Sequence, residues 1–409
     1  ISSAIREARQ QLQGFIDALA GVGSGAAPAV RHVLLLTIDT LRRDALSVYG
    51  GSNPTPNIDA LSAQGVRFAQ CTATAPITLP SHASILTGLD PYAHGVRDNG
   101  FYLLADAHTT LAEAFRAAGY ATAAQIASPV LAAQYGLDQG FDVYVDPAAV
   151  RDEPKNGAGC RLASGIADRS IEWLRAQGDK PFFLWAHFFD PHRTYDAPER
   201  FVRAHPGKPY LAEIAYVDEQ IGRILTELRD LGIEGSTLVA LTTDHGEGLG
   251  EHDEPTHVYF LYDTTVATAW IVRCPRVLPA GRTVTQQVRS IDIAPTLLAL
   301  CGIDAPQFAR GIDLAALMRG DASDLHLAAY SETFATYNHV GYSQARSIRR
   351  GGWKYIPLPE PELYHVEEDP AELVNLVATQ PAIADDLRET LRRLIEAAPD
   401  PAAITIDAT

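Results

Sequence analysis

Three uninterrupted apolar runs set the pattern of this chain. They cover residues 33–38, 182–189 and 237–243, and helical patterns separate them. A run without polar alternation is typical of a strand buried on both faces, and strands that alternate with helices build parallel sheets. We therefore predict an α/β fold with a doubly wound, mostly parallel sheet flanked by helices.

The helices between these runs carry recognisable start and stop signals. Thr110 and Glu113 have the spacing of a capping box, which predicts a helix start. Apolar residues recur at helical spacing over residues 211–228, which predicts a long helix with one buried face. A shorter helix is predicted between Pro80, which suits a first turn, and Gly88, which suits an end.

The pattern of predicted elements at both ends of the chain differs from that of the central part. Residues 1–30 predict an amphipathic helix over 3–19 and then a flexible Gly/Ala linker. Residues 326–409 predict a small antiparallel sheet closed by a helix over 383–397. Its expected strands are the short segments 327–332, 345–349, 353–357 and 362–366. The central domain is accordingly predicted to span residues 31–325.

Composition narrows the classes of partner. The 409 residues are 46% hydrophobic and 20% charged, and the formal net charge is −17. This excess of negative charge argues against a nucleic-acid or anionic-membrane partner. An anionic small-molecule substrate would need positive charge supplied locally, and bound cations can supply it. No run reaches the roughly 18 apolar residues of a membrane span, and the four cysteines lack metal-ligand spacing.

The first residue bears on location. The chain begins at Ile1 rather than Met, so we expect a leader or anchor to have been removed. An extracytoplasmic location, periplasmic or secreted, is favoured on that ground. The sequence leaves open whether copies of the chain form a homo-oligomer.

Polar residues with metal-binding chemistry follow the predicted strands. Asp39 ends the first run, and Asp244 and His245 end the third. Ligands bind beyond the carboxyl ends of strands in such sheets, so these side chains should converge. Thr78, at the start of the helix near Pro80, adds a hydroxyl. Asp39, Thr78, Asp244 and His245 form an oxygen and nitrogen set suited to Zn²⁺ or Mn²⁺, although Thr78 could alternatively be an ordinary helix cap.

A second group of polar residues lies beside the same strand ends. It consists of His187, Asp190, His192, His252 and His257. Asp190, His192 and His257 could build a second metal site, as in two-metal phosphoryl transfer. Without a metal, the group could hold the non-bridging oxygens of a substrate or protonate its leaving group.

Taken together, these stretches resemble the sulfatase branch of the alkaline-phosphatase superfamily over residues 32–376. The segments that carry the resemblance are 34–39 (LLLTID), 55–59 (TPNID), 80–88 (PSHASILTG), 91–95 (PYAHG), 241–247 (LTTDHGE), 292–296 (DIAPT), 363–364 (LY) and 369–373 (DPAEL). The resemblance implies the α/β fold, a metal at Asp39, Asp244 and His245, and a nucleophile at Thr78.

The departures from that family are informative. A sulfatase of this branch has Cys or Ser in C/S-x-P-x-R and oxidises it to formylglycine, whereas this chain has Thr78 and, for the Arg, His82. Oxidation of threonine gives a ketone, so no formylglycine is expected. These sulfatases also have a second Asp directly after the one that matches Asp39, and this chain has Thr40 there. They have a Lys-x-His motif downstream of the nucleophile, which the aligned residues 125–129 lack. His257 occupies the position where many of them have a substrate-binding Lys.

These departures resemble phosphodiesterase and phosphoethanolamine-transferase relatives, which use threonine nucleophiles. We therefore predict a hydrolase of phosphate or phosphonate esters, mono- or diesters, that forms a phosphothreonine at Thr78. His82, His187 and His257 are its predicted catalytic partners. One or two divalent ions are expected; Zn²⁺ or Mn²⁺ is favoured, and Ca²⁺ or Mg²⁺ stays an alternative. The alternatives are a sulfatase without formylglycine, a phosphoryl-group transferase, and a binding protein with a decayed site.

Overall fold

The computed structural model describes residues 29–306, 309–321, 325–397 and 404–405. The helix predicted over residues 3–19 lies outside these ranges, as does the linker before Ala29. Within the described part, no helix combines the length and the apolar character needed to cross a bilayer. Four cysteines are present as free thiols.

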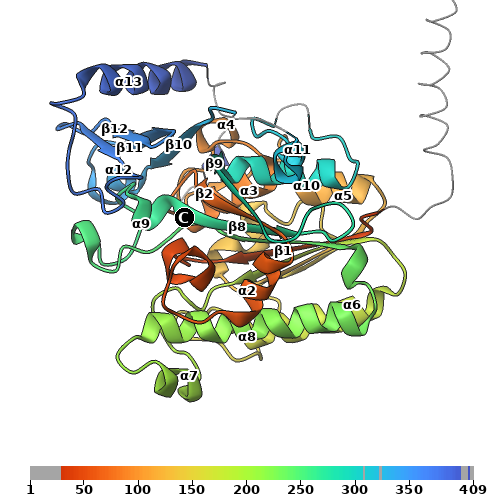
Figure 1. Ribbon diagram of the computed structural model, residues 1–409. Helices are drawn as coiled ribbons and strands as arrows, with labels where there is room; N and C mark the ends of the chain where they lie inside the picture. Colours follow the sequence, from red (N-terminus) through yellow and green to blue (C-terminus); the bar gives the residue numbers. More distant parts are fainter. Residues whose placement is uncertain (1–28, 307–308, 322–324, 398–403, 406–409) are drawn as a thin grey trace, which may run out of the picture.

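An eight-stranded sheet forms the centre of the molecule (Figure 1), with the strand order β5-β4-β6-β1-β7-β8-β2-β9. Its strands are β1 (His32–Ile38), β2 (Val66–Thr72), β4 (Ala121–Ile126), β5 (Val143–Val145), β6 (Phe182–Phe188), β7 (Thr237–Thr243), β8 (Ala267–Arg273) and β9 (Arg282–Arg289). Only β8 runs antiparallel to its neighbours β7 and β2. The predicted doubly wound, mostly parallel sheet is confirmed.

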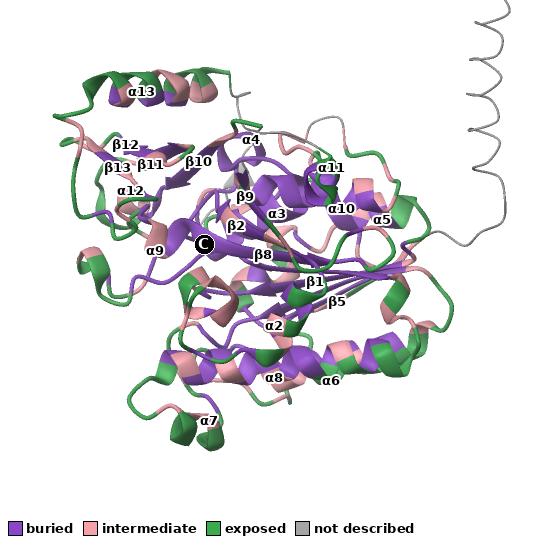
Figure 2. Ribbon diagram, in the orientation of Figure 1, coloured by how far each residue is buried: buried purple, intermediate pink, exposed green. Residues whose placement is uncertain are grey.

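The three strands predicted from apolar runs are adjacent in this sheet. β1 pairs in parallel with β6 on one side and with β7 on the other. All three are buried along their whole length (Figure 2). The register places Ile38 opposite both Phe188 and Thr243, so the three strands end at the same level.

Helices cover both faces of the sheet. One face packs against α2 (Pro56–Ala63), α6 (Ala163–Gln177) and α8 (Pro209–Asp230), and the other against α3 (Thr78–Thr87), α5 (Leu111–Ala117) and α10 (Ile293–Leu300). Alternate residues of β1 divide between the two cores, because successive side chains of a strand point to opposite faces: Val33 and Leu35 join one core, and Leu34 and Leu36 the other.

The predicted helix boundaries can be compared with the observed ones. Thr110 accepts a hydrogen bond from the Glu113 backbone and Glu113 bonds back, which is the predicted capping box at the start of α5. α3 ends at Gly88 in the left-handed conformation. The shorter elements are α4 (Pro91–His94), α7 (Glu199–Ala204), α9 (Asp263–Val266), α11 (Ala315–Arg319), α12 (Ala335–Val340), β3 (Tyr102–Leu103) and β14 (Ile404–Thr405).

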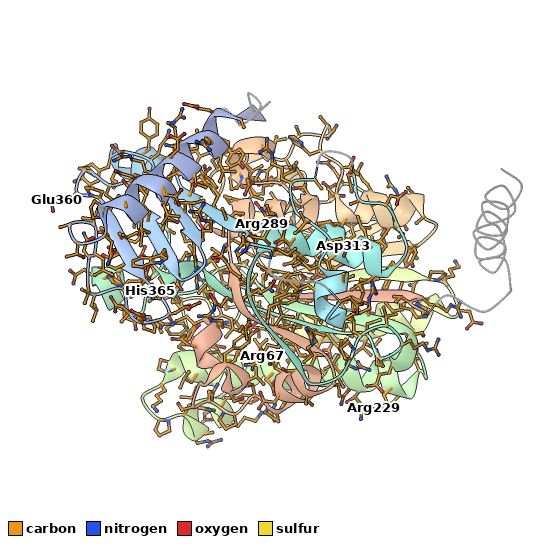
Figure 3. All side chains as sticks on the ribbon, turned by 45° about the horizontal axis from the view of Figure 1, so that its top comes forward. Arg67, Arg229, Arg289, Asp313, Glu360 and His365 are labelled. Atoms are coloured by element: carbon orange, nitrogen blue, oxygen red, sulfur yellow. The ribbon has the colours of Figure 1, made fainter. Side chains whose placement is uncertain are left out.

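A separate four-stranded antiparallel sheet forms the C-terminal part (upper left of Figure 1). It consists of β10 (Ala328–Thr333), β11 (Ala345–Arg350), β12 (Trp353–Ile356) and β13 (Glu362–His365), and α13 (Pro381–Glu396) packs on it. At the end of β13, His365 (labelled in Figure 3) meets Trp353 edge to face. This is the predicted small antiparallel unit closed by a helix.

A buried ion-pair network, which we call the junction, joins the two sheets. Lys354 Nζ lies 2.9 Å from Asp263 Oδ1 and 3.0 Å from Glu372 Oε1. Arg349 Nη1 lies 2.9 Å from the other oxygen of Asp263. Two cations therefore face two carboxylates, and the charges cancel within the protein.

Candidate active site

The carboxyl ends of β1 and β7 bring the predicted metal ligands together. Asp39 follows β1 directly, and its backbone N–H still bonds to the Phe188 carbonyl of β6 at 2.9 Å. Asp244 and His245 follow β7. Gly246 is required next, because a Cβ there would lie 2.1 Å from the Thr264 carbonyl oxygen. The backbone at Gly246 therefore lies directly against that of Thr264, and the preceding residue, His245, faces Asp39.

Asp39, Asp244 and His245 offer ligand atoms that all lie within 4.8 Å of one another. His245 Nε2 is 3.8 Å from Asp39 Oδ1 and 3.4 Å from Asp244 Oδ2. All three side chains are fully buried. Among the residues that the structure describes, this is the one group of three or more such side chains with metal-binding spacing.

Three of the four carboxylate oxygens of this group lack hydrogen-bond partners. Both oxygens of Asp39 and Oδ2 of Asp244 are buried without a hydrogen bond, and within the described chain neither residue pairs with Lys or Arg. Burial, and then the charge of Asp39, raise the pKa of Asp244 well above its usual value. Burial acts in the same direction on Asp39, but the neighbouring histidines outweigh it and lower its pKa. Two buried carboxylates with free oxygens fit a divalent cation.

His245 is held in the tautomer that suits a metal ligand. Its Nδ1 donates to the Gly246 carbonyl at 2.9 Å, which leaves the Nε2 lone pair facing the carboxylates. Burial, followed by repulsion from His257, lowers the pKa of His245 to about 4, so the ring is neutral. A neutral imidazole fixed by a backbone carbonyl is the usual form of a metal-binding histidine.

Thr78 lies beside this group as the first residue of α3. Its Oγ1 is 3.5 Å from His245 Nε2, and the side chain is 2% exposed. The alternative interpretation of Thr78 as an ordinary helix cap is wrong, because the cap position is Ile77 and no side chain caps the helix. The Thr78 hydroxyl therefore faces the metal-ligand group from a helix N-terminus.

His82 lies one helical turn after Thr78, and both of its nitrogens have protein partners. Nδ1 is 2.8 Å from the Thr78 carbonyl, and Nε2 is 3.1 Å from Thr37 Oγ1. Because the Thr78 carbonyl can only accept, Nδ1 donates to it, and Nε2 of the neutral ring then accepts from the Thr37 hydroxyl, which itself accepts from Trp185 Nε1 at 2.9 Å. Burial, then repulsion from His187, lowers the pKa of His82 to about 3. His82 thus holds the first turn of α3 and has no nitrogen left for a metal or a substrate.

His187 lies behind Asp39. Its Nδ1 accepts the Ala127 backbone N–H at 3.3 Å, so the proton is on Nε2, which points to Asp39 Oδ2 at 3.5 Å. His187 therefore supports a predicted metal ligand from the side away from His245.

His257 and His192 line the other side of His245. The His257 ring centre is 4.6 Å from that of His245 and 5.0 Å from that of His192. His257 Nδ1 lies 3.2 Å from Glu247 Oε1, which leaves Nε2 free. His192 stacks on Phe189 at 4.2 Å. Sequence reasoning missed Glu247, although its position directly after Asp-His-Gly was a usable signal.

Asp190 and His252 lie apart from Asp39, Asp244 and His245, which we call the central group. Asp190 Oδ1 accepts the Ala163 backbone N–H at 3.0 Å at the start of α6, and its other oxygen is unpaired. Burial raises the pKa of Asp190 to about 7. His252 stacks on Tyr262 at 3.6 Å and lines a separate cavity of about 740 Å³. The described residues form no metal-binding group from Asp190, His192 and His257, because Asp190 is turned toward α6.

Two further residues next to the group, Asn99 and Thr40, were not predicted as site residues. Asn99 Oδ1 accepts the Leu79 backbone N–H at 2.8 Å, directly after Thr78. Thr40 is a β-branched residue with a φ of 54°, and its backbone N–H donates to Asp244 Oδ1 at 3.2 Å. This strained turn aims one oxygen of Asp244 at the backbone and frees the other.

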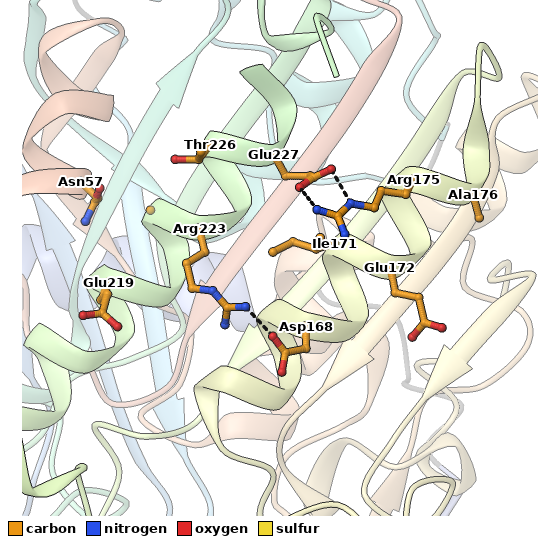
Figure 4. A pocket seen from close by; sticks show the side chains of 11 residues that line it. Asn57, Asp168, Ile171, Glu172, Arg175, Ala176, Glu219, Arg223, Thr226 and Glu227 are labelled. Atoms are coloured by element: carbon orange, nitrogen blue, oxygen red, sulfur yellow. Dashed lines mark hydrogen bonds and ion pairs between the residues drawn. The ribbon is translucent and has the colours of Figure 1, made fainter. Parts of the chain in front are cut away.

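A hollow of about 850 Å³ between α6 and α8 is not part of this site (Figure 4). Both arginines that line it are engaged in ion pairs, Arg223 with Asp168 and Arg175 with Glu227. None of the predicted site residues lines it.

Comparison with known proteins agrees with this geometry. The family described as Sulfatase matches residues 31–303, and the family described as N-sulphoglucosamine sulphohydrolase, C-terminal, matches residues 250–397. The chain is similar to the ulvan-active sulfatase of Formosa agariphila, with 26% identity over 71% of this chain and 66% of that protein. The chain thus spans about two thirds of the length of that relative.

Two solved structures share the fold. One is a protein in complex with its substrate D-glucosamine-2-N,6-O-disulfate, with a TM-score of 0.79, 22% identity, and coverage of 91% of this chain and 98% of the other. The second is the phosphonate monoester hydrolase of Agrobacterium radiobacter, with a TM-score of 0.75, 24% identity, and coverage of 90% and 95%. The family match spans more than half of the chain and contains every residue of the central group, so this protein belongs to the sulfatase family.

Proposed function

We propose that this protein is a metal-dependent hydrolase of phosphate or phosphonate esters in which Thr78 is the covalent nucleophile. The supporting observation is the position of the Thr78 hydroxyl, 3.5 Å from His245 Nε2 and beside two buried carboxylates with unpaired oxygens. Asp39, Asp244 and His245 would hold one ion, with Zn²⁺ or Mn²⁺ favoured by the nitrogen and oxygen ligands. A bound cation would supply positive charge that lowers the pKa of the Thr78 hydroxyl and attracts an anionic ester.

The proposed reaction has two balanced steps. First, Thr78 Oγ1 forms a bond to phosphorus, the bond to the ester oxygen breaks, and an alcohol or phenol leaves with a proton. Then water attacks phosphorus, the bond to Oγ1 breaks, and the Thr78 hydroxyl regains its proton. The products are the free acid and the alcohol, and no oxidant or reductant is consumed.

The surrounding histidines would transfer protons, contact the substrate and position the nucleophile and a metal ligand. His257 is oriented by Glu247 and lies beside His245, and its Nε2 makes no hydrogen bond among the described residues, so this nitrogen can take up a proton and pass it to the leaving oxygen, or take one from water. His192 beside it can contact a non-bridging oxygen of the ester. His82 and His187 would keep Thr78 and Asp39 in place.

A sulfatase that acts through Thr78 without formylglycine is the second candidate. It is favoured by the family match and by the similarity to an ulvan-active sulfatase. Against it stands the chemistry of position 78, since a threonine cannot be oxidised to an aldehyde. The similarity in fold to a phosphonate monoester hydrolase is equally compatible with phosphorus as the reacting centre.

Four esters of 4-nitrophenol separate these candidates because they share one leaving group. We expect kcat/KM for the phosphate monoester, phosphate diester or phenylphosphonate ester to exceed that for the sulfate ester. A clear preference for sulfate would overturn the choice of phosphorus and leave the nucleophile assignment standing.

Replacement of the nucleophile tests the mechanism itself. We expect Thr78→Ala to lower kcat by at least about a thousandfold, equivalent to roughly 4 kcal/mol. Thr87→Ala is the matched control, because Thr87 is a buried threonine at the other end of α3. Among the described residues its hydroxyl bonds only to backbone groups, those of Ala83 and Leu89. Near-normal turnover by Thr78→Ala would exclude Thr78 as the nucleophile.

A further inference from the structure

Three exposed rings from distant parts of the chain meet beside the active site. Phe101 is 45% exposed, Tyr259 is 36% exposed, and the His339 side chain is 35% exposed. The His339 ring centre lies 6.2 Å from that of Phe101 and 6.1 Å from that of Tyr259, so His339 is between the two. We call Phe101, Tyr259 and His339 the aromatic rim.

The aromatic rim is tied to the nucleophile by a short chain of hydrogen bonds. His339 Nε2 is 3.1 Å from Oδ2 of the buried Asp98, and Asn338 donates to the same oxygen at 2.8 Å. The other oxygen of Asp98 accepts the Asn99 backbone N–H at 2.8 Å. Asn99 in turn accepts the backbone N–H of Leu79, the residue after Thr78. These hydrogen bonds fix the segment that carries Phe101 relative to the first turn of α3.

A second connection comes from the histidine side of the site. Tyr259 lies two residues after His257, and its backbone N–H donates to Glu254 at 2.8 Å. Between them, the Val258 carbonyl accepts the Thr333 hydroxyl, which precedes α12 and its His339. In Figure 1, α12 and α9 lie on the same side of the molecule. The rim thus borders the site on both the Thr78 side and the His257 side.

The chemistry of the rim differs from that of the centre. The centre offers imidazoles and carboxylates, which suit the charged head of an ester. The rim offers aromatic faces, and the carboxylate beneath it, Asp98, already has partners at both oxygens. Exposed aromatic faces beside a polar centre bind ring-shaped groups through their apolar faces.

We propose that the aromatic rim is the binding site for the leaving group of the substrate, and that this group is a six-membered ring, of an aryl alcohol or of a sugar. The proposal deepens the proposed function, because it names the part of the ester that the centre does not hold. The anionic head lies at Thr78 and His245, and the ring packs against the faces of the aromatic rim. An ester of a small alkyl alcohol reaches the centre but leaves the rim uncovered.

Binding to a chain that cannot turn over tests this independently of catalysis. Calorimetry on Thr78→Ala, loaded with Zn²⁺ or Mn²⁺, compares methyl phosphate with phenyl phosphate and with a hexose 6-phosphate. We expect at least one ring-bearing ester to bind about tenfold more tightly than methyl phosphate. The better of the two ring esters identifies an aryl or a sugar leaving group.

Rim variants in the same background locate the effect. We expect Phe101→Ala and Tyr259→Ala each to reduce the preference for the ring to about threefold or less, with methyl phosphate affinity unchanged. Tyr342→Ala is the matched control, because Tyr342 is 73% exposed and makes no ring contact among the described residues. Equal binding of all three esters, or a ring preference that survives both rim variants, would overturn the proposal. If the unsubstituted protein hydrolyses none of the phosphate esters but the preference for the ring still depends on the rim, the proposed reaction is refuted and the binding role of the rim stands.

Discussion

The active centre and the junction are both clusters of buried charge, but only one of them is balanced. At the junction, Lys354 and Arg349 face Asp263 and Glu372 at 2.9–3.0 Å. At the centre, the side chains within ion-pair distance of Asp39 and Asp244 among the described residues are histidines, and two of them, His82 and His245, are neutral. A buried charge is tolerated when it is paired, so the junction is complete in itself, whereas the unpaired carboxylate oxygens of the centre support the proposed cation site. The difference separates a structural cluster from a functional one.

Breaking the junction should have the largest effect on stability. Lys354→Met leaves Asp263 and Glu372 buried without their shared cation, and we expect unfolding to become easier by about 3–5 kcal/mol. Chemical denaturation with and without the substitution measures this. Arg392→Met is the control, since Arg392 forms ion pairs on the exposed face of α13 and should change stability very little. Equal effects of the two substitutions would contradict the distinction.

A divalent cation should stabilise the centre if the proposed metal site is right. With Zn²⁺ or Mn²⁺ at a hundred times its dissociation constant, we expect a gain of about 2.7 kcal/mol in the free energy of unfolding. Thermal unfolding of chelator-treated protein, titrated with each metal, measures the gain. Lys354→Met should retain the full gain, and Asp39→Asn should lose it. A protein whose unfolding ignores both metals and chelators would contradict the metal site.

Removing a carboxylate from the metal-free centre should change stability far less than removing a charge at the junction. Burial and the charge of Asp39 raise the pKa of Asp244. Asp39→Asn removes this charge, but it also removes the charge that the histidines stabilise, so we expect the metal-free protein to change in stability by less than about 1 kcal/mol while metal binding is lost. Denaturation in the presence of a chelator compares the variant with the unsubstituted chain. A loss of several kcal/mol would show that Asp39 is paired in a way that the structure does not contain.

The smallest expected effect is on pH dependence. Burial, and then Asp190, raise the pKa of Glu213 from 4.5 to about 8, and burial raises that of Asp190 from 3.8 to about 7. Both carboxyls bind protons more tightly in the folded state, so their contribution is present below pH 4 and is lost as the pH rises to about 8. Metal-free protein should therefore melt at a lower temperature at pH 8 than at pH 6. Glu213→Gln should reduce that difference, and an unchanged difference would exclude Glu213 as its source.

The strands that carry the site could be predicted closely because each is a continuous apolar run. β1, β6 and β7 start and end within one residue of the predicted limits. β4 escaped prediction, because its sequence ATAAQI is rich in alanine, which has little preference for strands. β8 runs antiparallel between buried neighbours, and no local pattern shows its direction.

Residue types were easier to predict than roles. Asp39, Asp244, His245 and Thr78 were identified as one group from strand ends and a helix start, and the structure brings them together. The roles of His82 and His187 depend on Thr37 and on the Ala127 backbone, which are 45 and 60 residues away in sequence. The junction pairs Lys354 with a carboxylate 91 residues away, and no motif in the sequence indicates that contact.

The central claim, that Thr78 becomes phosphorylated during turnover, can be tested by trapping the intermediate. Metal-loaded protein mixed with 4-nitrophenyl phosphate, quenched in acid within one turnover and digested, should yield the peptide containing Thr78 with the mass of one added phosphoryl group on that residue. Thr78→Ala should yield the unmodified peptide. Turnover without modification of Thr78, or with the phosphoryl group on another residue, would contradict the account.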